Sequence, residues 1–307
     1  MSVEWDTVPR SAQRGGRCAK SDLEGADMSQ ARTYPEGVTS WIDLDGPDVE
    51  AAQAFYGGLF GWTFTNATPL GASLRYVVAK LHGLDAAGMG EPAEAAGRAV
   101  GPAAWNTYVA VTDADAAAAR IEAAGGHVLV GPSDVGDAGR STICADPSGV
   151  SFRLWRAHRR LGAQVVNTHG AWNFSDLHAA DPEASAAFYS EVFGWSIDNL
   201  GFAMMIRQPG YGDHLEATID PEIRTRQVGA PAGFADAIGW LAPIGTAEQP
   251  HWHVSFTVAD RDATATAAER LGGTVLSRTD SDWTRDALIR DPQGGVFTAS
   301  QFTPPTP

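Results

Sequence analysis

The sequence predicts an α+β protein built from four βαβββ units, and three pairs of matching segments are the observations behind this fold class. The pairs are "DVEAAQAFYGGLFGW" (48–62) with "DPEASAAFYSEVFGW" (181–195), "NTYVAVTDADAAAARIEAAGG" (106–126) with "HVSFTVADRDATATAAERLGG" (253–273), and "DPSGVSFRLW" (146–155) with "DPQGGVFTAS" (291–300). The first and third units share a helix that ends in FGW, whereas the second and fourth share the DPxG turn. This distribution indicates that a domain of two units has been duplicated.

Each unit follows the same order of elements. A short strand of alternating polarity ends in an aspartate such as Asp48, which can cap the next helix by accepting its first free N–H groups. The Ala-rich helix of the second unit stops at Gly125 and Gly126. In the DPxG turn, Pro147 sets φ and Gly149 can take the positive φ that closes the hairpin. We place the four units at about 37–92, 103–157, 168–221 and 250–302.

Composition bounds the class of protein. Of the 307 residues, 44% are hydrophobic and 19% are charged, which is typical of a globular chain. The net charge of −15 argues against nucleic acid and anionic membranes as partners, because no basic surplus is present to neutralise phosphates. Two cysteines and the lack of an apolar run long enough to cross a membrane predict a cytoplasmic protein. We expect either a monomer or a homodimer.

The chain divides into an extension and two domains. Residues 1–35 are polar and lack the apolar core of a signal peptide, so we expect a disordered N-terminal extension. Residues 36–160 are expected to form an N-terminal domain and residues 167–304 a C-terminal domain, each of two units. The connection at 221–250 is longer than its counterpart at 93–102, and we interpret it as an insertion in the C-terminal domain.

This order of elements resembles the vicinal oxygen chelate superfamily, which includes glyoxalases, bleomycin-resistance proteins and extradiol dioxygenases. The resemblance is carried by "DVEAAQAFYGGLFGW", "DPEASAAFYSEVFGW", "HVSFTVAD" and the two DPxG strands, and it extends from Gly37 to Phe302. It implies two glyoxalase-like domains, in each of which two βαβββ units form a concave mixed sheet with the ligand in its cleft. The fold by itself does not identify the reaction.

The resemblance also implies where a metal ion would be held, with one ligand from the first strand of each unit and one from the last strand. Counting seven residues before the capping aspartates and seven after the aspartate of DPxG gives Trp41, Asn106 and Arg153 in the N-terminal domain, and Phe174, His253 and Thr298 in the C-terminal domain. Only His253 is a good ligand for a divalent transition metal. This departure argues against extradiol cleavage, and we expect no cofactor.

Polar residues of the C-terminal domain could still form a site. "HWHVSF" puts His251, His253 and Ser255 on one face of a strand, because side chains alternate along a strand. Asp176 is expected to point into the same cleft, where a buried carboxyl group could act as a base.

A further contribution is expected from "GDHLEAT" (212–218), which we interpret as a late strand of the third unit with His214 and Glu216 on one face. If these side chains converge, the catalytic candidates are His253, Asp176, His214 and Glu216. A divalent metal is possible in this domain, with ligands from His253, His251, His214 and Glu216. The alternative is that the same side chains only line a polar pocket.

Substrate contacts are expected from the insertion and from the segment before it. The insertion carries Phe234 and Trp240 and could close over the cleft, which "RQPGYGDHLE" (207–216) would line. The substrate-binding candidates are Arg207, Tyr211, Phe174, Trp240, Phe234, Thr298 and Ser255. The alternative is a solvated turn beside a loop without a role in binding.

The N-terminal cleft offers fewer candidates. Asp43 occupies the place of Asp176, and Arg153 faces the same cleft. Arg153 could hold a substrate carboxylate or pair with Asp43, and Asp43 could be a base or hydrogen-bond to Tyr108. The aromatic residues of the two FY…FGW helices are expected in the core.

These features predict a small-molecule enzyme of the vicinal oxygen chelate type that works in the C-terminal cleft. The expected chemistry is acid/base isomerisation, cyclisation or hydration of an oxygenated secondary metabolite. Three alternatives stay open: a resistance-type protein that binds and sequesters a small molecule, a metal-dependent glyoxalase or dioxygenase-like enzyme, and a non-catalytic scaffold.

Overall fold

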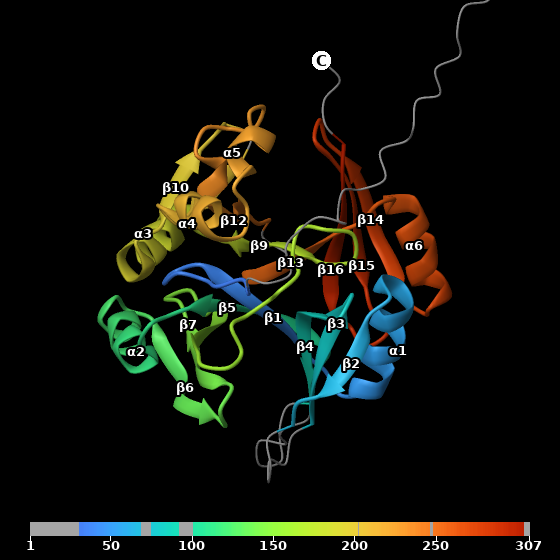
Figure 1. Ribbon diagram of the computed structural model, residues 1–307, viewed down its shortest axis with the longest axis horizontal. Coiled ribbons are helices and arrows are strands. Elements are labelled where there is room, and N and C mark those ends of the chain that lie inside the picture. The colour runs from blue at the N-terminus through green and yellow to red at the C-terminus, as the bar shows by residue number, and fades with distance from the viewer. Residues whose placement is uncertain (1–30, 69–74, 92–100, 202, 246–247, 304–307) are drawn as a thin grey trace, which may run out of the picture. The chain divides into compact units, whose positions relative to one another are not determined.

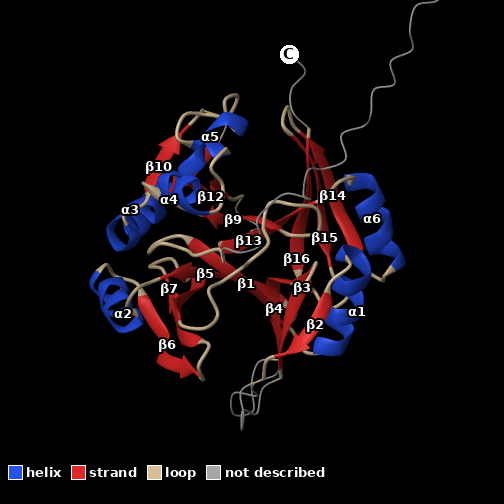
Figure 2. Cartoon of the chain, viewed as in Figure 1, coloured by secondary structure: helices blue, strands red, loops and turns tan. Residues whose placement is uncertain are grey.

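A computed structural model describes residues 31–68, 75–91, 101–201, 203–245 and 248–303. Its strands form two eight-stranded mixed sheets, one from each half of the chain, and its helices lie on the outer sides of these sheets (Figures 1 and 2). This architecture confirms the α+β class and the two glyoxalase-like domains that the sequence predicts. Among the described residues, no helix is long and apolar enough to cross a membrane.

The N-terminal sheet has the strand order β2-β3-β4-β1-β5-β8-β7-β6. Its strands are β1 (Thr39–Asp45), β2 (Thr63–Asn66), β3 (Tyr76–Leu81), β4 (Leu84–Gly90), β5 (Ala104–Ala110), β6 (His127–Val135), β7 (Gly139–Ala145) and β8 (Ser151–Ala157). Its helices are α1 (Val49–Phe60) and α2 (Ala114–Ala123). The first strands of the two units, β1 and β5, lie antiparallel at the centre of the sheet.

The C-terminal sheet repeats this order as β10-β11-β12-β9-β13-β16-β15-β14. Its strands are β9 (Trp172–Ala179), β10 (Ser196–Asn199), β11 (Met204–Arg207), β12 (Ala237–Pro243), β13 (His251–Thr257), β14 (Thr274–Asp280), β15 (Thr284–Arg290) and β16 (Val296–Phe302). Its helices are α3 (Pro182–Phe193), α4 (Tyr211–Thr218), α5 (Ile223–Arg226), the 3₁₀ helix η1 (Phe234–Asp236) and α6 (Arg261–Arg270). The central antiparallel pair is here β9 and β13.

The capping residues explain why the long helices begin where they do. Asp48 and Asp181 each accept a hydrogen bond from a first-turn amide of α1 and α3, and Asp113 and Asp260 do the same for α2 and α6. α1 and α3 end at glycines in the left-handed region, where a side chain would be strained. The repeated aspartates of the sequence therefore set the start of each unit's helix.

The units pack across the two halves of the chain. One core joins the first unit to the fourth, and a second core joins the second unit to the third, so that α1 lies beside α6 and α2 beside α3 (Figure 1). The hydroxyl of Tyr56 donates to Asp291 at 2.8 Å, and that of Tyr189 donates to Asp146 at 3.3 Å. The tyrosine of each FGW helix thus bonds to the aspartate of a DPxG turn in the other half, which accounts for the distribution of the two motifs.

The tryptophans of the two FGW motifs tie the halves together in the same way. Trp62 donates its indole N–H to the carbonyl of Gly170 at 2.7 Å, and Trp195 donates to the carbonyl of Gly37 at 2.7 Å. Both indoles are buried, as is Tyr56. The expectation that the FY…FGW aromatic residues belong to the core is confirmed.

The third unit differs from the prediction. "GDHLEAT" is not a strand but the helix α4, and the last strand of the unit is β12, which pairs with β9. Tyr211 and Leu215, four residues apart, are buried on one side of α4, and Gly210 starts it with φ of 86°. The extra residues therefore lie inside the third unit, between β11 and β12, and form α4, α5 and η1. The insertion expected at 221–250 thus starts earlier than its predicted bounds, and β12 is not part of it.

The segment before the first strand is partly described. The hydroxyl of Tyr34 donates to the carbonyl of Ala163 at 2.6 Å, and the amide of Arg32 donates to the side chain of Gln164 at 3.0 Å. Residues 31–35, which we assigned to the disordered extension, are thus bonded to the connection between the two sheets. Residues 1–30 of that assignment lie outside the described residues.

Candidate functional site

The two sheets place equivalent residues at the centres of their concave faces. In the N-terminal sheet Asp43 lies opposite Asn106, and in the C-terminal sheet Asp176 lies opposite His253. Two pairs further along, and on the same face, Asp45 lies opposite Ala104 and His178 opposite His251. On the neighbouring strands Tyr108 lies beside Arg153 and Ser255 beside Thr298. The two faces can therefore be compared residue by residue.

The N-terminal face is filled by its own polar side chains. Asp43 is fully buried, and its carboxylate accepts from the hydroxyl of Tyr108 at 2.6 Å, from Asn106 at 3.0 Å and from Arg153 at 3.1 Å. Tyr76 donates to the same carboxylate at 3.1 Å. Of the two alternatives for Arg153, the structure shows the ion pair with Asp43. A carboxylate that already accepts these four hydrogen bonds is not available to bind a substrate.

The two phenols are held as donors in this network. Burial raises the pKa of Tyr108 and of Tyr76 well above the usual value for tyrosine, and the charge of Asp43 adds to both rises. Space for Tyr76 exists because residue 88 is glycine: a Cβ there would lie 1.9 Å from the phenol oxygen. A glycine is therefore needed at position 88 to leave room for the ring of Tyr76, which covers this end of the face.

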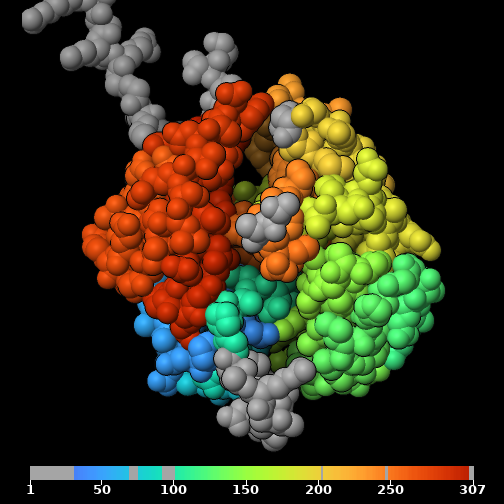
Figure 3. Space-filling view, turned by 180° about the vertical axis from the view of Figure 1, so that it is seen from behind, coloured from blue at the N-terminus to red at the C-terminus, as the bar shows by residue number. Residues whose placement is uncertain are grey.

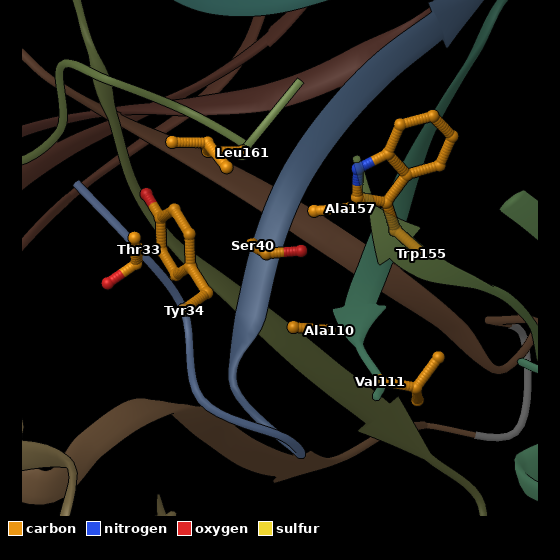
Figure 4. A pocket seen from close by; sticks show the side chains of 8 residues that line it. All are labelled: Thr33, Tyr34, Ser40, Ala110, Val111, Trp155, Ala157 and Leu161. Carbon is orange, nitrogen blue, oxygen red and sulfur yellow. The ribbon is translucent and has the colours of Figure 1, made fainter. Parts of the chain in front are cut away.

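The other end of the N-terminal face retains a pocket of about 90 Å³ (Figure 4). Tyr34 and Leu161 lie on one side of it and Trp155 on the other, with Ser40 between them. Ser40 Oγ is buried and has no hydrogen-bond partner among the described residues. This volume is well below the roughly 300–1,000 Å³ of pockets for drug-sized ligands.

On the C-terminal face, the equivalent carboxyl group has no ion-pair partner among the described residues. Asp176 is half-buried and accepts from the backbone amide of Trp240 at 3.1 Å, while Thr298 and Ser255 stand where the other face has Arg153 and Tyr108. Burial raises the pKa of Asp176 to about 7 against the opposite effect of the Trp240 amide, and the charge of Asp286 adds to the rise.

His253 lies beside this carboxyl on the neighbouring strand. It is 6% exposed, and its Nε2 is 2.8 Å from the hydroxyl of Thr298. Burial lowers the pKa of His253 to about 3, and the imidazoles of His178 and His251 contribute to the decrease. His253 is therefore a neutral imidazole at neutral pH, bonded to a hydroxyl on the floor of the face.

A second group of polar side chains lies at the end of the same face. The ring centroids of His178 and His251 are 4.7 Å apart, and His178 Nδ1 is 2.7 Å from the carboxylate of Glu248. One ligand atom from each of these three residues lies within 4.8 Å of the other two. Within the described ranges, these are the residues that could together hold a metal ion.

Three aromatic rings form a wall over the C-terminal face. Phe174, Phe234 and Trp240 have ring centroids 6.3–6.5 Å apart, with Phe174 at steep angles to both partners. Phe234 belongs to η1, Trp240 to β12 and Phe174 to β9. Figure 3 shows a hollow in the surface between the red residues of the fourth unit and the yellow to orange residues of the third.

Three other candidates lie away from this face because the helix α4 points them elsewhere, and Arg207 on β11 is paired within its own sheet. Glu216 forms an ion pair with Arg224 at 2.9 Å and His214 is hydrogen-bonded to Thr33 at 3.2 Å, both on the exposed side of α4. Tyr211 is buried and accepts from Arg32, and Arg207 forms an ion pair with Asp198. The expectation that His214 and Glu216 converge with His253 was wrong, since it assumed a strand.

Sequence reasoning missed His178, Glu248 and Asp286. His178 could have been found, because it follows Asp176 by two residues on the same strand and must share its face. Asp286 has a buried Oδ1 without a hydrogen-bond partner in the described part of the chain. Glu248 sits on a connection of irregular backbone, where no periodic pattern indicates a direction.

In neither sheet do the residues at the metal-binding positions of the fold family fit a metal ion. Its counted positions hold Trp41, Asn106 and Arg153 in one and Phe174, His253 and Thr298 in the other. Arg153 and Asn106 are engaged with Asp43, and His253 alone offers an imidazole. A set with one ligand cannot hold a transition metal in the way these folds do.

Comparisons with known proteins agree with the fold. Residues 40–154 match the family model of the Glyoxalase/Bleomycin resistance protein/Dioxygenase superfamily, and residues 174–300 match that of a glyoxalase-like domain. The chain is 32% identical to "Putative glyoxylase CFP32" of Mycobacterium tuberculosis over 90% of its length and 99% of the relative's. It is 34% identical to "Anthracycline biosynthesis protein DauV" of a Streptomyces species over 66% of each chain.

Solved structures show the same fold at low identity. The Mn(II)-bound glyoxalase from Novosphingobium aromaticivorans superposes with a TM-score of 0.55 at 16% identity, over 87% of this chain and 83% of that one. The 2,3-dioxygenase LapB from Pseudomonas sp. KL28 superposes with a TM-score of 0.55 at 13% identity, over 89% and 95% of the two chains.

Proposed function

Because the chain belongs to the Glyoxalase/Bleomycin resistance protein/Dioxygenase superfamily, we propose that it is an enzyme for an oxygenated aromatic metabolite. The substrate binds on the concave face of the C-terminal sheet, and the carboxyl group of Asp176 moves a proton in an isomerisation, cyclisation or hydration step. The single observation that carries this proposal is the contrast between Asp43 and Asp176. The first is paired with Arg153 and enclosed by tyrosines, whereas the second occupies the same place beside Thr298 and Ser255 and has no ion-pair partner among the described residues.

The wall of aromatic rings supports the substrate class. Phe174, Phe234 and Trp240 lie on the same side as Asp176 and offer flat apolar surface to a planar ligand. Two relatives, DauV and DnrV, carry names that place them in anthracycline biosynthesis. A polycyclic aromatic polyketide with carbonyl and hydroxyl groups therefore fits both the rings and the relatives.

The polar floor of the face suggests how the step proceeds. The Trp240 amide holds one carboxylate oxygen of Asp176, so the other is free to take a proton from a substrate atom made acidic by a neighbouring carbonyl. The electron pair of the broken bond passes to the carbonyl oxygen, and the carboxylic acid then returns the proton to a different atom. The bonded pair of Thr298 and His253 supplies a hydroxyl and an imidazole that can position the substrate oxygen.

A binding and turnover experiment tests this proposal. An anthracycline added to the protein should quench the fluorescence of Trp240, and purified Asp176→Asn should bind it with similar affinity. Polyketide precursors incubated with the wild type should be converted, whereas Asp176→Asn should return them unchanged. A wild type that binds these compounds and releases every one of them unchanged would favour the sequestering protein instead.

A further inference from the structure

We propose that His178, His251 and Glu248 form a binding site for a divalent transition-metal ion at the end of the C-terminal face. This site goes beyond the proposed proton transfer, and it is not at the place where the fold family holds its metal. The counted positions of that place are Phe174, His253 and Thr298, and none of the three residues proposed here is among them.

The backbone brings the two histidines together. His178 on β9 and His251 on β13 are directly opposite partners in the antiparallel register, two pairs beyond Asp176 and His253. Both side chains point to the concave face, because they alternate with the buried residues Leu177 and Trp252. The imidazoles are therefore fixed side by side by two central strands, which makes a rigid base for a metal site.

Glu248 completes the set from outside the sheet. Its Oε1 lies 2.7 Å from His178 Nδ1 and 3.8 Å from His251 Nδ1. Ligands bonded to one tetrahedral ion at about 2.1 Å are roughly 3.4 Å apart. The three ligand atoms, within 4.8 Å of one another, thus need only a small side-chain rotation to close on an ion.

The chemistry of the set favours a transition metal. Two neutral imidazoles and one carboxylate are ligands for Zn²⁺, Mn²⁺ or Fe²⁺, whereas Mg²⁺ and Ca²⁺ prefer oxygen ligands only. The side chains of His178 and His251 are 25% and 40% exposed, so an ion can enter from solvent and keep open positions. In the described part of the chain, the ion-pair partners of Glu248 are these two histidines, and no arginine or lysine competes for it.

The other half of the molecule offers an internal control. The positions equivalent to His178 and His251 are Asp45 and Ala104, and Asp45 forms an ion pair with Arg153. Among the described residues, the cluster therefore occurs on the C-terminal face and has no counterpart at the equivalent positions of the N-terminal face. An ion held there would stand next to the bound substrate, where it could coordinate a ketone or phenolate oxygen.

Metal binding by the full chain tests the site. After dialysis against a chelator, Zn²⁺ is titrated in a calorimeter, and Co²⁺ absorption is recorded as a signature of imidazole ligands. We expect one ion per chain in the wild type, and at least a tenfold loss of affinity in each of His178→Ala, His251→Ala and Glu248→Gln. His127→Ala, which removes an exposed histidine from β6, should bind like the wild type.

Two results would overturn the site. Equal affinity of the wild type and of a His178→Ala/His251→Ala double variant would show that the ion binds elsewhere. Loss of binding in His253→Ala but not in His178→Ala would put the ion at the inherited position. Because affinity is measured without substrate, neither result bears on Asp176. Conversely, a failure of Asp176→Asn to change turnover leaves the metal site standing.

Discussion

The two concave faces of this protein are formed by sheets of the same strand order but carry different side chains. On the N-terminal face, Asp43 is surrounded by Arg153, Tyr108 and Tyr76, and the remaining space is about 90 Å³. On the C-terminal face, the equivalent Asp176 stands beside a threonine, a serine and a neutral histidine. Different side chains on equivalent strands thus give the two carboxyl groups different surroundings, and we propose that the second face serves chemistry.

The contrast shows how a carboxyl group acquires its role from its neighbours. A buried carboxylate that is bonded to an arginine and two phenols is costly to disturb. A carboxyl group in the same position that accepts from a backbone amide has its pKa raised to about 7, so it can exchange a proton near neutral pH. The predictions below test this division.

The largest effect is expected from removing the proton-transfer group. Asp176→Asn should lower the turnover of the compound found in the binding test by about 10²–10⁴-fold, the range for loss of a general acid or base. The free energy of unfolding should change little, since no charged partner is left behind. Steady-state kinetics and urea unfolding measure the two quantities, and unaltered turnover would remove Asp176 from the mechanism.

The equivalent change on the other face should affect stability and not turnover. Asp43→Asn removes one of the two carboxylates that pair with Arg153, whose guanidinium stays inside the protein. We expect this loss to lower the free energy of unfolding by about 3 kcal/mol. Urea unfolding monitored by circular dichroism gives this value, and kinetics of the folded variant should match the wild type. If Asp43→Asn loses activity while keeping its stability, the functional face has been assigned to the wrong half.

A smaller effect is expected from the aromatic wall. Trp240→Ala should weaken binding of a planar aromatic ligand by about 30-fold, corresponding to about 2 kcal/mol for one buried ring. Trp155→Ala, which truncates an indole beside the N-terminal pocket, is the matched control and should leave the affinity unchanged. Calorimetric titration separates the two variants, and equal losses in both would contradict binding on the C-terminal face.

The smallest effect concerns the bonds between the halves. Tyr56→Phe should lower the free energy of unfolding by about 1.5 kcal/mol, because its hydroxyl donates to a buried carboxylate. Tyr189→Phe should cost less, since its bond to Asp146 is longer by 0.5 Å (3.3 Å against 2.8 Å). Thermal unfolding of the two variants side by side gives the order, and the reverse order would show that packing outweighs these bonds.

Much of this arrangement could be predicted from the repeats. The aspartate caps and DPxG turns are local signals with a direct physical cause, so the units and their order follow from them. Counting along the first strands also places Asp176 and His253 on one face, because strand geometry fixes the direction of each side chain. The roles of these two residues stay predictions.

The insertion could not be placed in the same way. The strand assigned to "GDHLEAT" is the helix α4, because the burial of Tyr211 and Leu215 at a spacing of four residues outweighs the apparent alternation. Because of that error we expected His214 and Glu216 on the C-terminal concave face, which they do not reach. Glu248 comes from a connection whose path depends on the whole fold, so no local pattern could have indicated it.

The crossed packing of the units has a consequence for the history and folding of the chain. Each core needs one unit from either half, so a half-length ancestor could have buried its apolar helices only by pairing with a second copy of itself. Fusion of two such copies would turn the dimer axis into an internal one and leave each copy free to diverge. Residues 167–307 produced alone should therefore be unstable as a monomer, and adding residues 31–160 in trans should restore cooperative unfolding.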